Sequence, residues 1–200
     1  MTDDSKQKKY IKSKNSSGNR KVDYKWVVTI IIWTFIISCS MQTIQEGLMS
    51  RVTLFVACLL LFSFIFIGII FDIIGVAVTA ASEVPFHSLA SRKIRGAKEA
   101  VSLIRNAYKV GNFCNDVIGD IVGIISGSAT TAIVVMLNVF VPGNHQFILS
   151  IGLAGLVAAL TVGGKAIGKG IALSNSNNIV FTVGKIISFF KPKKRKGKQS

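Results

Sequence analysis

Four long runs of apolar residues interrupt an otherwise polar chain. Residues 26–40 carry no charge, residues 52–71 are apolar apart from two hydroxyl side chains, and residues 121–141 and 146–164 are also uncharged. A helix needs about 20 consecutive apolar residues to span the hydrocarbon core of a bilayer. The pattern therefore predicts an all-α membrane protein with four transmembrane helices.

The first apolar run is the shortest, and a cleaved signal peptide is the alternative interpretation. Ser38, Cys39 and Ser40 are small, as residues at a cleavage site are. However, a polar stretch over residues 1–25 precedes the run, and signal peptides begin their apolar region sooner. We therefore expect an additional N-terminal transmembrane helix within residues 26–50, preceded by a disordered basic tail over residues 1–25.

Basic residues alternate between the segments that flank the apolar runs. The flanking segments hold, in chain order, eight, one, six, none and nine Lys or Arg residues. Basic residues gather on the cytoplasmic side of membrane proteins, so both termini are expected in the cytoplasm of a multi-pass protein of the cytoplasmic membrane. The net charge of +15 is thus assigned to a membrane surface. The basic C-terminal tail, residues 191–200, is expected to attract anionic lipid headgroups, and no nucleic-acid partner is expected.

The second run is expected to continue as one helix over residues 52–84, longer than a bilayer core. Gly68 and Gly75 are places where it could bend. After Pro85, apolar and basic residues recur at helical spacing. This predicts a cytoplasmic juxtamembrane amphipathic helix over residues 86–109, either unbroken or a helical pair broken at Gly96. Residues 179–190 form a second amphipathic segment.

Four of the nine acidic residues lie within or at the edge of apolar runs: Asp72, Glu83, Asp116 and Asp120. A charge at mid-bilayer costs at least about 2.5 kcal/mol, so such residues are paired or functional. At 100° per residue, Asp72 and Glu83 share one helix face, with Ser82 beside it. The third span is expected to start near residue 110, ahead of its apolar run, and a second polar face lies at this start, namely Asn112, Asn115, Asp116 and Asp120.

The two faces are expected to meet, because the second and third spans are antiparallel. Glu83 would then lie at the depth of Asn112 and Asn115, and Asp72 at the depth of Asp120. Carboxylates, amides and hydroxyls together form an all-oxygen site that suits a hard cation such as Mg²⁺. Na⁺ or H⁺ fits the same groups.

Plain structural roles compete with this interpretation. Lys165 and Lys169 lie near the inner end of the fourth span and would pair with Glu83 and Asp116, while Asn and Ser side chains often only join membrane helices. The sequence contains no phosphate-binding loop, no nucleophile with a partner base and no zinc-ligand spacing. An enzyme is therefore not expected.

Several motifs resemble the membrane domain of the CNNM/CorC (CorB) magnesium-transporter family. The segment TAASEVPFHSLASRKIRG contains a Ser-Glu pair, Ser82-Glu83, and then a basic run over residues 91–95. Gly119-Asp120 is similar to a Gly-Asn pair of the family. Near the end, Lys169, Ala172 and Asn175 match the lysine, alanine and asparagine of a family segment with the pattern Gly-Glu-x-x-Pro-Lys-x-x-Ala-x-x-Asn-Pro. The resemblance covers about residues 55–190, so residues 51–190 are interpreted as a CNNM/CorC-like domain.

The resemblance implies a homodimer with an inward-facing acidic cavity that holds Mg²⁺. The inner ligands would be Ser82 and Glu83 with Asn112 or Asn115. The remaining residues of the predicted metal site, Asp116, Asp120 and Asp72, would hold the cation path. The chain departs from the family in two ways: Lys165 stands where the family has a glutamate, and no cytoplasmic CBS domains follow within the sequence. Two hypotheses result. The protein binds or transports a divalent cation, or it is a non-transporting regulator or scaffold in which Lys165 replaces the cation.

Overall fold

A computed structural model describes residues 24–137 and 145–190, and these residues form helices joined by short turns, with no β-strand among them. The described helices, in chain order, are α2 (Tyr24–Met49), α3 (Leu54–Ala80), α4 (Val84–Ser91), α5 (Ala97–Arg105), α6 (Ala107–Asn112), the π-helix η2 (Phe113–Ile118), α7 (Gly119–Leu137), α8 (His145–Ser174) and α9 (Ser176–Phe190). The expected C-terminal tail and nearly all of the expected N-terminal tail lie outside the described residues.

Four stretches of helix are long and apolar enough to cross a membrane. They are Tyr24–Met49, Leu54–Ala80, the continuous run Ala107–Leu137, and Phe147–Ser174. Many large apolar side chains on them are exposed, as expected of surfaces that face lipid. The predicted all-α class and the four apolar spans are therefore confirmed.

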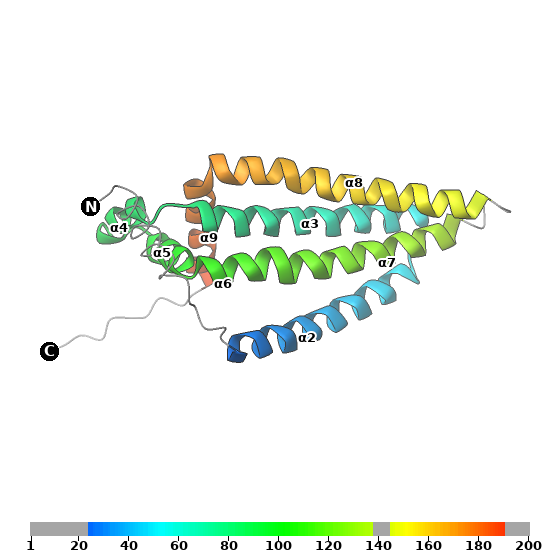
Figure 1. The fold of residues 1–200 in the computed structure, drawn as a ribbon, viewed down its shortest axis with the longest axis horizontal. Helices are drawn as coiled ribbons and strands as arrows, with labels where there is room; N and C mark the ends of the chain where they lie inside the picture. Colours follow the sequence, from blue (N-terminus) through cyan, green and yellow to red (C-terminus); the bar gives the residue numbers. More distant parts are fainter. Residues whose placement is uncertain (1–23, 138–144, 191–200) are drawn as a thin grey trace, which may run out of the picture. The chain divides into compact units, whose positions relative to one another are not determined.

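The chain divides into two compact units, residues 1–36 and residues 37–200. The described part of the first unit is the N-terminal half of α2. In the second unit, α3, α7 and α8 pack side by side (Figure 1). The sites discussed below all belong to the second unit.

Glycines set the close approach of α3 to the helix that returns across the membrane. A Cβ atom at Gly68 would lie 2.8 Å from Val122 Cγ1, and one at Gly111 would lie 3.0 Å from Thr79 Cγ2. A Cβ at Gly75 would collide with the Asn115 side chain. Residue numbers fall along α3 as they rise along α6, η2 and α7, so the two spans are antiparallel. Gly68 and Gly75 are therefore contact points within a continuous α3.

Small residues also bring α8 against α3. A Cβ atom at Gly168 would lie 2.8 Å from Ile73 Cγ1, and one at Gly164 would overlap Ile69. Both pairs advance by four residues along both helices, so α3 and α8 run in the same direction. Small residues that allow close backbone approach are a common basis of helix packing in membranes.

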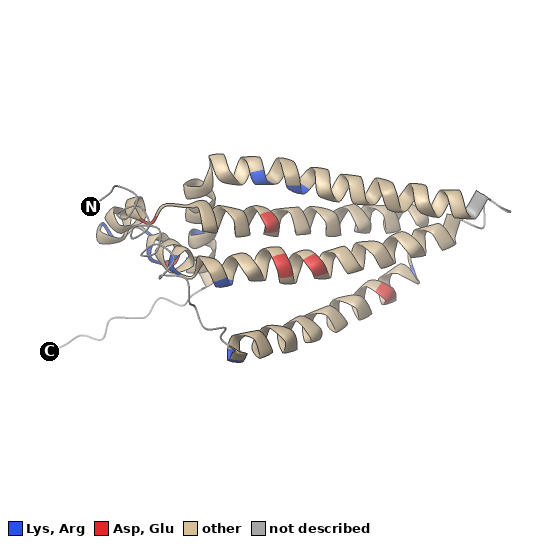
Figure 2. Ribbon diagram, in the orientation of Figure 1, with Lys and Arg blue, Asp and Glu red and all other residues tan. Residues whose placement is uncertain are grey.

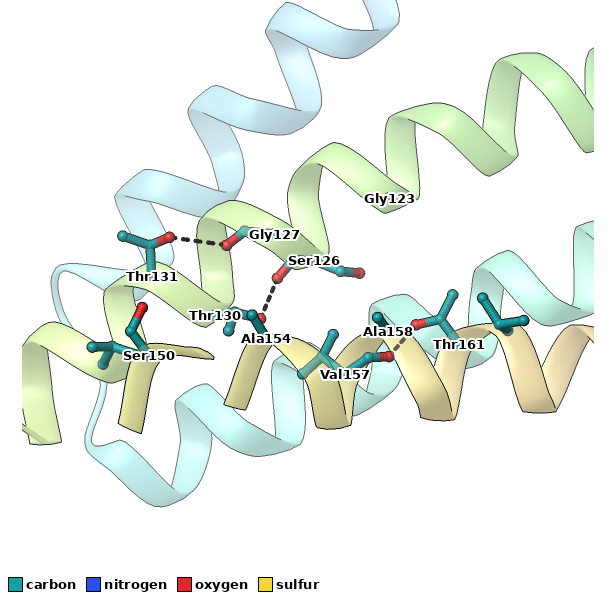
Figure 3. Close-up of a pocket in the computed structure, with 12 residues that line it drawn as sticks. Gly123, Ser126, Gly127, Thr130, Thr131, Ser150, Ala154, Val157, Ala158 and Thr161 are labelled. Carbon is teal, nitrogen blue, oxygen red and sulfur yellow. Dashed lines mark hydrogen bonds between the residues drawn. The ribbon is translucent and has the colours of Figure 1, made fainter. Parts of the chain in front are cut away.

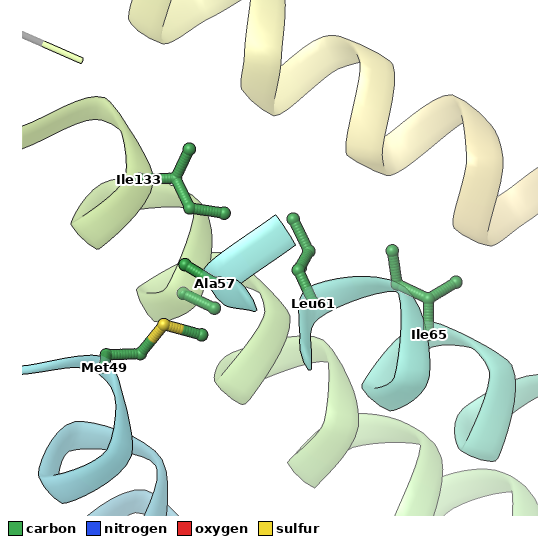
Figure 4. Close-up of a cluster of buried hydrophobic side chains, with 6 residues drawn as sticks. Met49, Ala57, Leu61, Ile65 and Ile133 are labelled. Carbon is green, nitrogen blue, oxygen red and sulfur yellow. The ribbon is translucent and has the colours of Figure 1, made fainter. Parts of the chain in front are cut away.

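An apolar cluster closes the end of the second unit where α2 meets α3. Met49 of α2 packs with Ala57, Leu61 and Ile65 of α3 and with Ile133 of α7 (Figure 4). Gln45 is also buried there, and its side-chain oxygen accepts a hydrogen bond of 3.0 Å from Ser128 Oγ. These contacts fix the C-terminal part of α2 on the bundle.

The prediction of one helix over residues 52–84 is wrong at its C-terminal end. Helix α3 ends at Ala80, Ala81 is extended, and Glu83 precedes α4, whose first turn contains Pro85. Proline favours the first turn of a new helix and lacks an N–H to continue an old one. The Ser82 N–H at this break donates a hydrogen bond of 3.0 Å to Asn177 Oδ1 of α9.

Residues 84–105 form a helical pair rather than a single helix. Helices α4 and α5 are separated by a turn in which Lys93 and Gly96 have positive φ angles of 56° and 90°. The segment at residues 107–109 belongs instead to α6, at the start of the third span. A second apolar cluster joins α3, α4, α5, α8 and α9 at this end of the bundle, through Ala77, Val78, Phe86, Ala100, Ala172 and Val180.

Candidate functional site

Asp72 is the buried acidic residue at the centre of the candidate site. It lies on α3 between Gly68 and Gly75, and only 5% of its surface is exposed. Its Oδ2 atom is buried and has no hydrogen-bond partner among the described residues. An unsatisfied carboxylate oxygen in a membrane interior is costly, so it requires a cation, a proton or a donor that approaches it.

Asn115 lies against α3 at Gly75, one turn from Asp72. Its amide packs against Gly75, which is one turn from Asp72 along α3. Its Oδ1 atom is likewise buried without a hydrogen-bond partner in the described part of the chain. Asn115 belongs to the π-helical turn η2, and such turns are frequent at functional sites because they redirect side chains.

Lys165 brings a positive charge from α8 to the same level. A Cβ atom at Gly119 would lie 3.5 Å from Lys165 Nζ. Gly119 is one turn beyond Asn115, and Lys165 lies between Gly164 and Gly168, which contact α3 on either side of Asp72. Asp72 is buried, and Asn115 and Lys165 are half-buried; we call these three residues the buried polar cluster. Figure 2 shows acidic positions on α3 and on η2 and α7, and basic positions on α8, within one stretch of the bundle.

Asp116 and Asp120 do not join this cluster. Both are exposed, on a face of η2 and α7 that continues through Gly123, Gly127 and Thr131. The predicted single polar face is therefore split: Asn115 turns toward α3, while the two acids turn away from it. A face that carries two carboxylates within a membrane span requires cover by protein or water.

A groove adjoins this face toward the other end of the bundle, between α7 and α8 (Figure 3). Its volume is about 300 Å³, and small or hydroxyl side chains line much of it. Thr130 and Thr131 donate hydrogen bonds to backbone carbonyls one turn earlier, which satisfies their hydroxyl groups within the helix. Gly123 and Gly127 have no described atom within 4 Å of a Cβ placed on them, so the groove has an open glycine wall.

Glu83 is held in a different environment, outside the spans. Arg105 Nε donates it a hydrogen bond of 2.6 Å, and His87 Nε2 lies 2.9 Å from the same Oε1 atom. The hydrogen bond and charge of Arg105 lower the pKa of Glu83, with a smaller contribution from His87. In the described ranges, Glu83 pairs with Arg105 and His87, whereas Lys165 and Lys169 form no ion pair with it.

Ser82 and Asn112 complete the predicted ligand set. Ser82 is exposed at the break after α3, with its backbone held by Asn177, and Asn112 is half-buried at the end of α6. Gly75 faces Asn115 and Thr79 faces Gly111, so Glu83, four residues past Thr79, lies more than a turn from the level of Asn112. The seven predicted residues thus occupy three places: the buried polar cluster, the exposed face of α7 and the turn before α4.

The arrangement differs from a preformed metal centre. Among the described residues, no group of three or more His, Cys, Asp and Glu side chains could hold a metal ion. Mg²⁺ prefers near-octahedral oxygen coordination and keeps several waters. Asp72 and Asn115 supply two buried oxygen acceptors, and Lys165 of α8 brings a positive charge to Gly119, one turn from Asn115.

Some contacts of the site were not anticipated from the sequence. Arg105 appeared only as part of a basic face, and Gly75 only as a place to bend. Gly119 was identified for its resemblance to the family rather than for its contact with Lys165. Gly75 follows Asp72 by three residues, so both lie on one face of the helix. This spacing was the sequence signal that could have identified Gly75 as a contact point of the site.

No family model matches the chain, and neither a curated protein nor a solved structure matches it significantly.

Proposed function

We propose that this multi-pass membrane protein is a non-transporting scaffold or regulator of the cytoplasmic membrane, in which Lys165 takes the place of a bound cation. The observation that supports this most is the approach of Lys165 Nζ to Gly119, where it would lie 3.5 Å from a Cβ atom, one turn from Asn115. Under this proposal the Lys165 ammonium compensates the negative charge of the Asp72 carboxylate, so a cation from solution is not required there.

The contacts of Glu83 support the same proposal. Its carboxylate accepts from Arg105 and contacts His87, so these neighbours already satisfy it. A cation that binds Glu83 would have to displace Arg105. Both termini lie in the cytoplasm under this proposal, as the alternation of basic residues indicates.

Binding or transport of a divalent cation such as Mg²⁺ is the second candidate. The unsatisfied Oδ2 of Asp72 and Oδ1 of Asn115 support it, because a bound cation would supply the missing partner of both atoms. The acids on the open face of α7 would then attract the ion toward the bundle.

Calorimetric titration of Mg²⁺ into the detergent-solubilised protein distinguishes the two candidates. We expect no stoichiometric binding by the natural chain. We expect Lys165→Gln to acquire Mg²⁺ binding, and the exposed neighbour Lys169→Gln, as the matched control, not to acquire it. Stoichiometric binding by the natural chain that is lost in Asp72→Asn would instead support the cation-binding candidate.

A homodimer is part of the proposal. The exposed face of Asp116, Asp120, Gly123, Gly127 and Thr131 is polar and has little side-chain bulk. Lipid tails cannot solvate its two carboxylates, whereas a second copy offers both small residues for packing and lysines for pairing. Lys169 is exposed on α8 and provides such a charge.

A further inference from the structure

Helix α9 has one face that packs against the juxtamembrane helices. A Cβ atom at Gly184 would lie 2.5 Å from the Gly96 carbonyl oxygen, so α9 and the start of α5 touch through their backbones. Val180 is fully buried, and the ring of Phe181 lies 6.3 Å from that of Phe86 on α4. This contact face holds α9 firmly at the end of the bundle.

The opposite face of α9 is apolar and exposed. Ile186 is 54% exposed, Phe189 73% and Phe190 79%. Part of this face also forms a mostly apolar recess of about 340 Å³ with Ile74 of α3. The exposed apolar surface of α9 is therefore continuous with that of a membrane-spanning helix.

Two cations border this apolar face. Arg95 donates hydrogen bonds to Ser188, from Nε to Oγ at 3.2 Å and from a terminal nitrogen to the carbonyl oxygen at 3.4 Å. Its guanidinium carbon lies 5.6 Å from the centre of the Phe189 ring. Lys185 Nζ lies 4.4 Å from the centre of the Phe181 ring. At 100° per residue, Lys185 and Ser188 fall along one edge of α9, beside Phe189.

We propose that α9 lies in the membrane interface and binds an anionic phospholipid, with Arg95 and Lys185 on the headgroup phosphate and Ile186, Phe189 and Phe190 among the acyl chains. Helices with a basic edge and a Phe-rich and Ile-rich face lie in the interface in this way. Arginine suits phosphate because its planar group donates several parallel hydrogen bonds. The apolar face beside the cations favours a lipid over free phosphate, because free phosphate has no use for it.

The local charge agrees with an anionic partner. Around α4 and α5 the chain carries five basic residues, Arg92, Lys93, Arg95, Lys98 and Arg105, against two acidic residues, Glu83 and Glu99. The sequence after Phe190 continues with the basic run KPKKRKGK. The proposal is independent of whether the buried polar cluster holds Lys165 or a metal ion.

The test uses the full-length protein, delipidated in an uncharged detergent. Phosphatidylglycerol or phosphatidylcholine is added, and bound lipid is counted by native mass spectrometry. We expect preferential retention of phosphatidylglycerol. Arg95→Gln and Lys185→Gln should each weaken it about fivefold, since a basic residue near an anionic surface contributes about 1 kcal/mol. Arg51→Gln, which removes the same charge outside the juxtamembrane region, should have no effect.

The two variants differ in what else they remove, and three results would overturn the proposal. Arg95→Gln also removes the bonds to Ser188. The Lys185 side chain donates no hydrogen bond within the described ranges, so Lys185→Gln removes only its charge and the contact of its ammonium with the Phe181 ring, and keeps the Cγ atom that lies beside Gly96. Equal retention of the two lipids would overturn the proposal. An equal loss in Arg51→Gln would also overturn it, and so would displacement of phosphatidylglycerol by millimolar glycerol phosphate.

Discussion

Asn115 on η2 presses its amide oxygen against Gly75 on α3, where no space remains for even a methyl group. This contact sets the distance between the second and third spans at the level of the buried polar cluster. It also places Asn115 within one turn of Asp72. The contact joins the packing of the bundle to the chemistry of the candidate site.

Gly75→Ala should therefore destabilise the protein by about 1–3 kcal/mol, the usual cost of overpacking a close interface. The matched control is Gly123→Ala, because no described atom lies within 4 Å of a Cβ placed there. Thermal unfolding of both variants in the same detergent measures the difference. Equal stability of the two would show that α3 and η2 do not approach as closely as described.

A double-mutant cycle can measure the coupling free energy between Asp72 and Lys165. Lys165→Met leaves a buried carboxylate with less compensation, so it should destabilise the fold more than Lys169→Met does. Asp72→Asn should partly reverse the loss, with a coupling free energy of about 0.5–3 kcal/mol. Additive effects of Asp72→Asn and Lys165→Met would contradict the role given to Lys165.

The interaction of Glu83 with Arg105 predicts that the stability of the protein falls in acid. Because the pKa of Glu83 is lowered from 4.5 in the folded protein, its contribution to stability is complete above that value. The contribution is lost as the pH falls through the lowered pKa. Below pH 4.5 the natural chain should therefore lose stability more steeply than Glu83→Gln, as thermal unfolding at several pH values would show. Parallel pH profiles would argue against the interaction.

The proposed homodimer depends on the open glycines of α7. Gly127→Leu should abolish it while leaving the monomer folded, because a side chain there meets open space within one described copy. Gly152→Leu is the control, since that glycine is equally open but lies on the side of α8 away from the groove. Cross-linking in membranes and light scattering in detergent measure the association. Dimers that persist in Gly127→Leu would place the interface elsewhere.

The sequence alone determined the membrane class and the four spans, because runs of apolar residues leave a chain few alternatives to helices that cross a bilayer. It also gave Gly96 as a possible break, as an alternative to an unbroken helix, and identified the acids that lie within or beside the spans. These features are local, and they follow from hydropathy and from the backbone preferences of glycine and proline.

Only the tertiary structure decided which polar groups meet. Helical periodicity placed Glu83 on the face of Asp72, but α3 ends at Ala80, so the turn before Pro85 carries Glu83 to Arg105 instead. Periodicity also grouped Asn115 with Asp116, whereas in the packed bundle Asn115 faces Gly75 and Asp116 is exposed. Ideal helical spacing does not record where a helix stops, where it widens by a residue, or which neighbour its glycines admit. The composition of the buried polar cluster depends on those three features, and they arise only when the helices pack.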